Sequence, residues 1–210
     1  MVKPFIVGTE NAKDALKAGV EALRRGGSAI DAVEAAIRVV EENPLDHGVG
    51  IGGIPNLLGV VQLDASIMEG RNLRAGAVAA VRGFLHPISI ARKVMEESPH
   101  VLLVGEGAEL FAEAMGFKRH GDLLTDKSRE IYQAFLENTL EQLDESFTWK
   151  DYIIRYVKNY RLRDWYERLV KYHGGTVDVM AMDANGDICS GVSTSGTALK
   201  LPGRVGDSPI

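Results

Sequence analysis

Residues 172–196 read YHGGTVDVMAMDANGDICSGVSTSG, and this stretch does most to decide the fold. Two runs in it, 176–183 and 187–196, alternate apolar with small or polar residues, which is the pattern of half-buried β-strands. An Asn-Gly pair stands between them, and this pair is the strongest short-range signal for a tight turn between antiparallel strands. The sequence therefore predicts a β-hairpin that begins at Thr176.

The pairing of this hairpin decides which side chains meet. With a two- or four-residue loop centred on Asn185-Gly186, residue i faces residue 371 − i, which places Thr176 opposite Ser195 and beside Thr194. A slip of one residue would place Thr194 directly across from Thr176. In either pairing, a second threonine lies next to the first.

Upstream of the hairpin, the sequence alternates between helical and extended patterns. Thr9 or Asn11 is expected to cap a first helix that ends at the Gly-Gly pair 26–27, and Ser28 to cap a second that stops at the Asn-Pro pair 43–44. A glycine-rich loop over 48–59 follows. Further on we expect strands over 60–68 and 75–84, a helix over 88–98, a short buried strand over 100–105 and a helix over 106–115. This mixture predicts a layered α/β or α+β domain.

Residues 118–172 form a charged, aromatic-rich stretch with a helical pattern that is clearest over 126–147. Its basic part, 149–171, could contact a nucleic acid or a membrane surface. The alternative is an amphipathic helix packed on the domain, and the acidic half of the same stretch favours that alternative.

Composition narrows the possible functions. The chain has 210 residues, of which 45% are hydrophobic and 25% charged, as in an ordinary globular domain. Its net charge of -5 argues against a nucleic-acid partner, because phosphate binding favours a basic surface. No apolar run reaches the roughly 18 residues of a membrane helix, and Met1–Gly8 is too short for a signal peptide, so we expect a cytoplasmic protein.

Most familiar catalytic patterns are missing. The five histidines are scattered without metal-ligand spacing, so no metal site is expected. GVGIGG (48–53) lacks the spacing of a dinucleotide fingerprint. Cys189, the only cysteine, excludes an internal disulfide and falls inside a predicted strand, where a small core residue is expected rather than a nucleophile.

Thr176 has two interpretations. Gly174-Gly175 before it is a flexible entrance to a strand, or it allows the strained backbone that an N→O acyl shift needs. In the second case the chain is cut before Thr176, and the freed α-amine serves as the base for the threonine hydroxyl. Such an amine has a pKa of about 7.7–8.0, which suits that role.

GRVGDSP (203–209) places Arg204 and Asp207 three residues apart in a glycine-flanked turn. Arginine can hold a carboxylate and aspartate an ammonium group, so together they could receive the α-groups of a free amino acid. The alternative is a local ion pair at the surface.

These motifs together closely resemble the asparaginase-2 family of N-terminal-nucleophile hydrolases, which includes plant-type L-asparaginase/isoaspartyl peptidase and glycosylasparaginase. The resemblance runs from about residue 12 to 210 and rests on ALRRGGSAIDAVEAAI, GVGIGG, LDASIMEG, AGAVAAV, PISIARKVME, HVLLVGEGAE, the Gly-Thr junction, STSG and GRVGDSP. It implies an αββα sandwich of the α+β class and autoproteolysis between Gly175 and Thr176. Residues 1–175 would then belong to an α-subunit and 176–210 to the start of a β-subunit, within one structural domain.

The same resemblance implies a role for each matching residue. Thr176 matches the nucleophile, Thr194 the threonine that supports it, and Arg204 and Asp207 the residues that hold the substrate's α-carboxylate and α-ammonium groups. The implied substrate is a small molecule, L-asparagine or a β-aspartyl peptide, cleaved to L-aspartate without a cofactor. An (αβ)2 dimer is also implied.

The chain departs from the glycosylasparaginase pattern at three positions. Those enzymes carry Asp where this chain has Gly175, a Trp near the position of Val7 and a Ser near that of Ile54. These differences favour the asparaginase/isoaspartyl peptidase side and leave glycosylasparaginase as the alternative.

The family also continues past the GDSPI at 206–210, with a stretch that supplies the oxyanion hole. We therefore expect the chain to be truncated, with C-terminal strands missing, and residues 1–210 alone to be unable to turn over asparagine. The non-enzymatic alternative is an inactive homologue with at most weak amino-acid binding.

Overall fold

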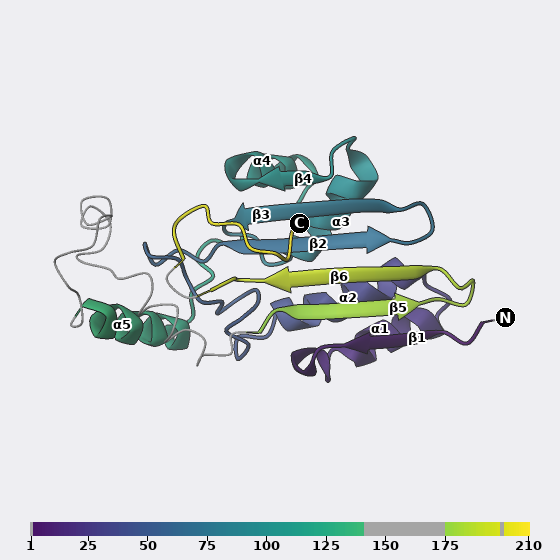
Figure 1. Ribbon diagram of the computed structural model, residues 1–210, viewed down its shortest axis with the longest axis horizontal. Coiled ribbons are helices and arrows are strands. Elements are labelled where there is room, and N and C mark those ends of the chain that lie inside the picture. The colour runs from purple at the N-terminus through teal and green to yellow at the C-terminus, as the bar shows by residue number, and fades with distance from the viewer. Residues whose placement is uncertain (1, 141–174, 198–199) are drawn as a thin grey trace.

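The computed structural model describes residues 2–140, 175–197 and 200–210 (Figure 1). Within these residues, six strands form one sheet in the order β1-β5-β6-β2-β3-β4. Neighbouring strands are antiparallel, except β3 and β4, which are parallel. The strands are β1 (Phe5–Gly8), β2 (Leu63–Glu69), β3 (Arg74–Val81), β4 (Leu102–Val104), β5 (Val177–Met182) and β6 (Ile188–Thr194).

Helices cover one face of this sheet (Figure 1). α2 packs on β5 and β6, α3 packs on β2 and β3, and α1 packs on α2. The described part is thus a helical layer on a mainly antiparallel sheet, which agrees with the expected α+β class. The helices are α1 (Leu16–Arg24), α2 (Ala29–Glu41), α3 (Pro87–Glu97), α4 (Gly105–Ala114) and α5 (Asp126–Leu140), and a short 3-10 turn covers Glu10–Ala12.

The second helix begins as predicted, and the first does not. Ser28 caps α2 through a capping box in which its Oγ accepts from the Asp31 N–H (3.3 Å) and Asp31 Oδ2 accepts from the Ser28 N–H (3.0 Å). α1 begins only at Leu16, after the 3-10 turn. Thr9 does not cap it, because its Oγ1 accepts from the Asp178 N–H of β5 (3.1 Å) and donates to Asn11 Oδ1 (2.6 Å).

The hairpin β5–β6 has the slipped pairing. Val177 faces Ser193 and Met182 faces Ile188, so partner numbers sum to 370 rather than 371. The reason is a three-residue loop, 184–186, in which Gly186 takes the left-handed conformation (φ 87°). Asp183 Oδ1 stabilises this loop by accepting from the N–H groups of Asn185 (2.9 Å) and Asp187 (3.2 Å).

One other prediction needs correction. β4 is not buried, because among the described strands it is an edge strand bonded only to β3, and Leu102 and Val104 are 39% and 51% exposed. The helix predicted most clearly from residue 126 is confirmed as α5, which begins at Asp126, and Thr125 caps it by accepting from the Ser128 N–H (3.1 Å). The predicted basic helix over 149–171 lies outside the described residues.

The sheet has one covered and one open face. Val177, Val179 and Ala181 point under the helices and are fully buried in the main core. On the opposite face, β1, β5 and β6 leave apolar side chains 45–52% exposed: Phe5, Val7, Met180 and Ile188. The C-terminal segment crosses this face over β2, where Ser66 Oγ donates to the Ser208 carbonyl (2.5 Å). Part of the open face is therefore an apolar surface.

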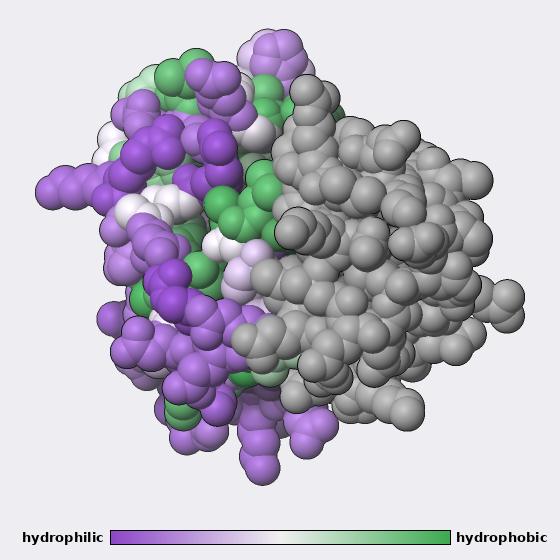
Figure 2. All heavy atoms as spheres, turned by 90° about the vertical axis from the view of Figure 1, so that its left-hand side faces the viewer, coloured by the Kyte–Doolittle hydropathy of each residue, from purple (hydrophilic) through white to green (hydrophobic). Residues whose placement is uncertain are grey.

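The start of β5 and the end of β6 lie at the left-hand side of Figure 1. Seen from that side, the described surface is largely hydrophilic, with small apolar groups between the polar ones (Figure 2). None of the helices in the described residues has the length and apolar character to span a membrane.

Candidate active site

Thr176 stands at the start of β5 with its side chain on the open face of the sheet. It is exposed, and its neighbour Val177 points into the core. One step beyond the Val177–Ser193 pair, Thr176 meets Thr194 at the end of β6. The two Oγ1 atoms are 3.3 Å apart, with Thr176 donating. The structure therefore brings together the two threonines that the sequence paired.

Thr194 is buried and fixed by three hydrogen bonds. Its Oγ1 accepts from Thr176 and from the Gly196 N–H (2.9 Å), and it donates to the Gly48 carbonyl (3.3 Å). Its own proton is thus directed at Gly48, and a lone pair is left for the proton of Thr176. This arrangement makes Thr176 Oγ1 a hydroxyl with a defined proton direction.

The glycine-rich loop, 48–53, holds the end of β6 in place. Gly48 accepts at its carbonyl from the Ser195 N–H (2.6 Å), and the Ile54 N–H donates to Ser195 Oγ (3.2 Å). Close packing requires glycine here: a Cβ on Gly53 would lie 2.7 Å from Ser195 Cβ, and one on Gly50, at φ 58°, would lie 2.0 Å from the Glu41 carbonyl oxygen. The sequence identified this loop but not its contact with β6.

Gly175, before the candidate nucleophile, lies beside a polar bridge that the sequence did not reveal. The nearest side-chain atom to a Cβ built on Gly175 would be Asn11 Nδ2, at 3.6 Å. Asn11 Nδ2 donates to Asp46 Oδ2 (2.9 Å), and Asp46 Oδ1 accepts from the Gly48 N–H (2.9 Å). The bridge thus connects the surroundings of Gly175 with Gly48, whose carbonyl accepts from Thr194.

The two members of the predicted clamp differ in exposure. Arg204 is half-buried, and its Nη1 lies 3.1 Å from the position of a Cβ on Gly196, the residue bonded to Thr194. Asp207 is exposed. In the described part of the chain no ion pair joins Arg204 to Asp207, so the alternative of a local surface pair is not found.

A buried carboxylate supports β6 from the helical side. Glu41 is fully buried, and its Oε1 accepts from Ser193 Oγ (2.7 Å) and from the Ile88 N–H (3.0 Å). Burial raises the pKa of Glu41. Its Oε2 lies 3.4 Å from His86 Nδ1, and a protonated Glu41 that donates to that nitrogen gives both atoms a partner.

Cys189 fits the sequence interpretation. Cys189 is 1% exposed, and burial raises its pKa to about 12, so it is a core residue as predicted. Across the described ranges, no group of three or more His, Cys, Asp or Glu side chains is placed to hold a metal ion.

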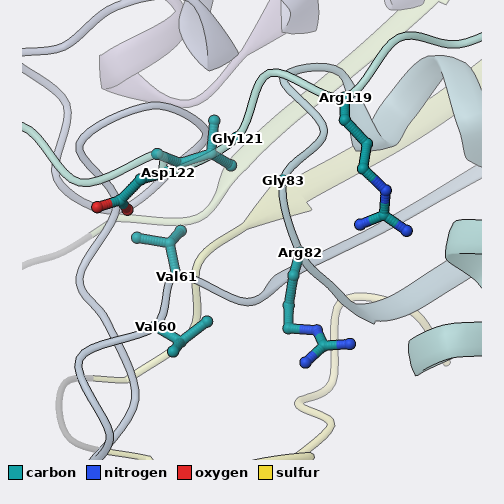
Figure 3. A pocket seen from close by; sticks show the side chains of 8 residues that line it. Val60, Val61, Arg82, Gly83, Arg119, Gly121 and Asp122 are labelled. Atoms are coloured by element: carbon teal, nitrogen blue, oxygen red, sulfur yellow. The ribbon is translucent and has the colours of Figure 1, made fainter.

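A separate hollow of about 390 Å³ lies beside the ends of β2 and β3 (Figure 3). The guanidinium groups of Arg82 and Arg119 extend away from Val60 and Val61 at its wall. Both arginines pair with the buried Glu109, at 2.7 and 3.1 Å. Arg119 also pairs with Glu113 at 2.5 Å, so two carboxylates face the two arginines. This hollow is therefore a weaker candidate for an anionic ligand than the surroundings of Thr194.

The chain was compared with known proteins. A family model described as asparaginase matches residues 6–210. The plant-type L-asparaginase of Pyrococcus abyssi is 41% identical over 207 residues, covering 96% of this chain and 61% of that protein. The N(4)-(beta-N-acetylglucosaminyl)-L-asparaginase of Elizabethkingia miricola is 39% identical over 212 residues, covering 99% of this chain and 54% of that protein. The isoaspartyl peptidase/L-asparaginase of Mus musculus is 37% identical over 194 residues, covering 91% of this chain and 52% of that protein. The chain thus spans between half and two thirds of the length of these relatives.

Proposed function

Because the chain belongs to this asparaginase family, we propose that it is an amidohydrolase, activated by its own cleavage, that converts L-asparagine or β-aspartyl peptides to L-aspartate. One observation carries the proposal. Thr176 is exposed behind a glycine, with its hydroxyl 3.3 Å from that of Thr194. The family predicts a nucleophile and its supporting hydroxyl at these two positions.

Activation would begin at the Gly175–Thr176 peptide bond. Thr176 Oγ1 attacks the Gly175 carbonyl carbon as its proton leaves toward Thr194, and the C–N bond breaks as the threonine nitrogen takes up a proton. Water then hydrolyses the ester, which leaves a carboxylate on Gly175 and a free α-amine on Thr176. The Asn11–Asp46 bridge supports this step, because it holds the chain beside Gly175.

Turnover would use the freed amine of Thr176 as general base. The amine takes the Oγ1 proton, Oγ1 attacks the side-chain amide carbon of the substrate, and the protonated amine passes its proton to the departing nitrogen. The acyl-enzyme ester is hydrolysed by water, which releases L-aspartate. Arg204 would hold the α-carboxylate, and its position beside Gly196 supports this role. Asp207 would hold the α-ammonium group, as in the family.

The choice among β-aspartyl amides depends on three positions. Gly175 stands before the nucleophile, Val7 is 45% exposed on β1, and Ile54 is buried against Ser195. The absence of the glycosylasparaginase residues at these positions supports an asparaginase/isoaspartyl peptidase. A relative named for the glycosylated substrate is nearly as similar, so glycosylasparaginase is the second candidate.

The finer architecture is also proposed. An αββα sandwich needs a second sheet on the open face, and the exposed Phe5, Val7 and Met180 support that packing, since apolar patches of this kind mark interfaces. The (αβ)2 dimer of the family and a cytoplasmic location are proposed with it.

The first prediction concerns Thr176. Intact mass spectrometry of the full chain should give two fragments that meet at 175/176, whereas Thr176→Ala should give one uncut polypeptide and no ammonia release. Thr176→Ser keeps a hydroxyl at the same place and should still be cut. Activity from a chain that never splits would refute the mechanism.

The substrate is tested on the same protein. L-asparagine, a β-aspartyl dipeptide and a glycosylated asparagine are assayed side by side at equal concentration. The proposal expects higher kcat/KM for the first two. Preference for the glycosylated compound would favour the second candidate, and a full-length protein inert to all three would favour an inactive homologue.

A further inference from the structure

Two positive charges converge on Gly196, next to Thr194. Lys200 is 1% exposed, and its Nζ lies 3.1 Å from the position of a Cβ on Gly196. Arg204 Nη1 lies at the same distance from the same point. The two nitrogens are therefore separated by no more than twice this distance, 6.2 Å. Two cations so close repel one another strongly in a buried setting.

The surroundings do not balance these charges. Lys200 Nζ donates to the Gln62 carbonyl (2.8 Å), and within the described residues it has no other hydrogen bond or ion pair. The acid that acts on it is the buried Asp64 of β2, and the two oxygens of Asp64 accept from the N–H groups of Ala80 (2.8 Å) and Gly206 (3.2 Å). The site thus holds two cations, Lys200 and Arg204, and one carboxylate, Asp64, whose oxygens already accept from backbone N–H groups.

We propose that Lys200 and Arg204 together form an anion site over Gly196 that holds the α-carboxylate of an amino-acid substrate, with Lys200 as its buried second cation. This inference rests on the proposed function and adds a residue to it. The Gly196 N–H donates to Thr194 Oγ1 at 2.9 Å, so a carboxylate held here lies one residue from the hydroxyl pair. Arginine supplies the paired donors and lysine a point charge.

The site should couple binding to protonation. Burial lowers the pKa of Lys200 to about 8. The negative charge of Asp64 opposes this shift, and the positive charge of Arg204 adds to it. An incoming carboxylate favours the charged form and raises this pKa. At pH 8 the free protein carries about half a proton on Lys200, so binding should draw about half a proton from solution.

The test is calorimetric titration of the full chain with L-aspartate at pH 8, in two buffers that differ in ionisation enthalpy. The wild type should take up protons when it binds L-aspartate. This uptake is measured as a difference in binding heat between the two buffers. Lys200→Met keeps the side-chain length without the charge, and it should bind about tenfold more weakly with no buffer dependence. Lys17→Met makes the same change at an exposed lysine and should behave as wild type.

Turnover gives a second readout. If Lys200 binds the α-carboxylate in both ground and transition states, Lys200→Met should raise the KM for asparagine about tenfold and leave kcat nearly unchanged. Unaltered KM and proton uptake in Lys200→Met would overturn the inference while leaving the proposed function intact.

The remaining outcomes are also decisive. A wild type that turns over asparagine but binds L-aspartate without proton uptake overturns the inference, whether or not the variant folds. A wild type that neither turns over nor binds removes the proposed function and the inference with it. Thermal unfolding checks the fold of Lys200→Met, which should be at least as stable as wild type, because replacing a buried charge by an apolar chain is tolerated.

Discussion

At the scale of the residue, Thr194 is the side chain on which the hydroxyl pair depends. Thr194→Val keeps its shape but removes the acceptor for Thr176 and the donor to Gly48. Cleavage before Thr176 and turnover should each slow by about 10²-fold, since proton transfer from the nucleophile loses its direction. A mass-spectrometric time course measures the first and ammonia release the second. Thr194→Ser should restore both, and unchanged rates in Thr194→Val would show that this hydroxyl is dispensable.

The residues of this site differ in how far the sequence predicts them. Thr176 and Thr194 were predicted as neighbours because strand alternation and an Asn-Gly turn are local patterns. Their register depended on the conformation of one glycine, Gly186, which a dipeptide preference does not fix. The Asn11–Asp46 bridge could not be predicted, because it joins residues 35 positions apart through a loop without periodicity.

At the scale of the elements, Glu41 connects the end of α2 with α3 and β6. Its Oε1 is bonded to the start of α3 through the Ile88 N–H and to β6 through Ser193, the residue before Thr194. The cap of α2 at Ser28 and the glycine-rich loop were both predicted from the sequence. A glutamate at the end of an amphipathic helix reads as a surface residue, and its burial follows from the packing of three elements.

The carboxyl of Glu41 should make stability depend on pH. Because burial raises its pKa above the ordinary 4.5, the folded state holds a proton that the unfolded state releases. The contribution of this proton to the free energy of unfolding is therefore fully present below pH 4.5. It is lost as the pH rises through the folded-state pKa. Urea unfolding should show a larger fall in stability from pH 4.5 to 7 for wild type than for Glu41→Gln, because the amide has no proton to lose.

His86 and Glu42 also lie beside this group. His86 Nε2 is 3.1 Å from Glu42 Oε1, and Glu42 is half exposed. Glu42→Gln is therefore the matched control, since it removes the other carboxylate beside His86 and leaves Glu41. It should keep the wild-type dependence on pH. Equal falls in stability for wild type and Glu41→Gln would show that Glu41 does not cause the dependence on pH.

At the scale of the whole molecule, the two sides of the proposed cut share one sheet. β5 and β6 follow Thr176, yet they lie between β1 and β2, which precede it. β1 pairs with β5 from Phe5–Met182 to Gly8–Val179. β2 pairs with β6 from Asp64–Thr194 to Glu69–Cys189. The hairpin also carries the core residues Val177, Val179 and Ala181.

Cleavage at 175/176 should therefore leave the protein assembled. Separation of the pieces would expose two strand edges and the apolar face of β5, so the fragments should remain together at neutral pH and part only in denaturant. Size-exclusion chromatography of the cut protein should give one peak at the elution volume of uncut Thr176→Ala, and a denaturing gel of that peak should give two bands. An N-terminal fragment that elutes alone would contradict this topology, because β1 and β2 have no common neighbour without the hairpin.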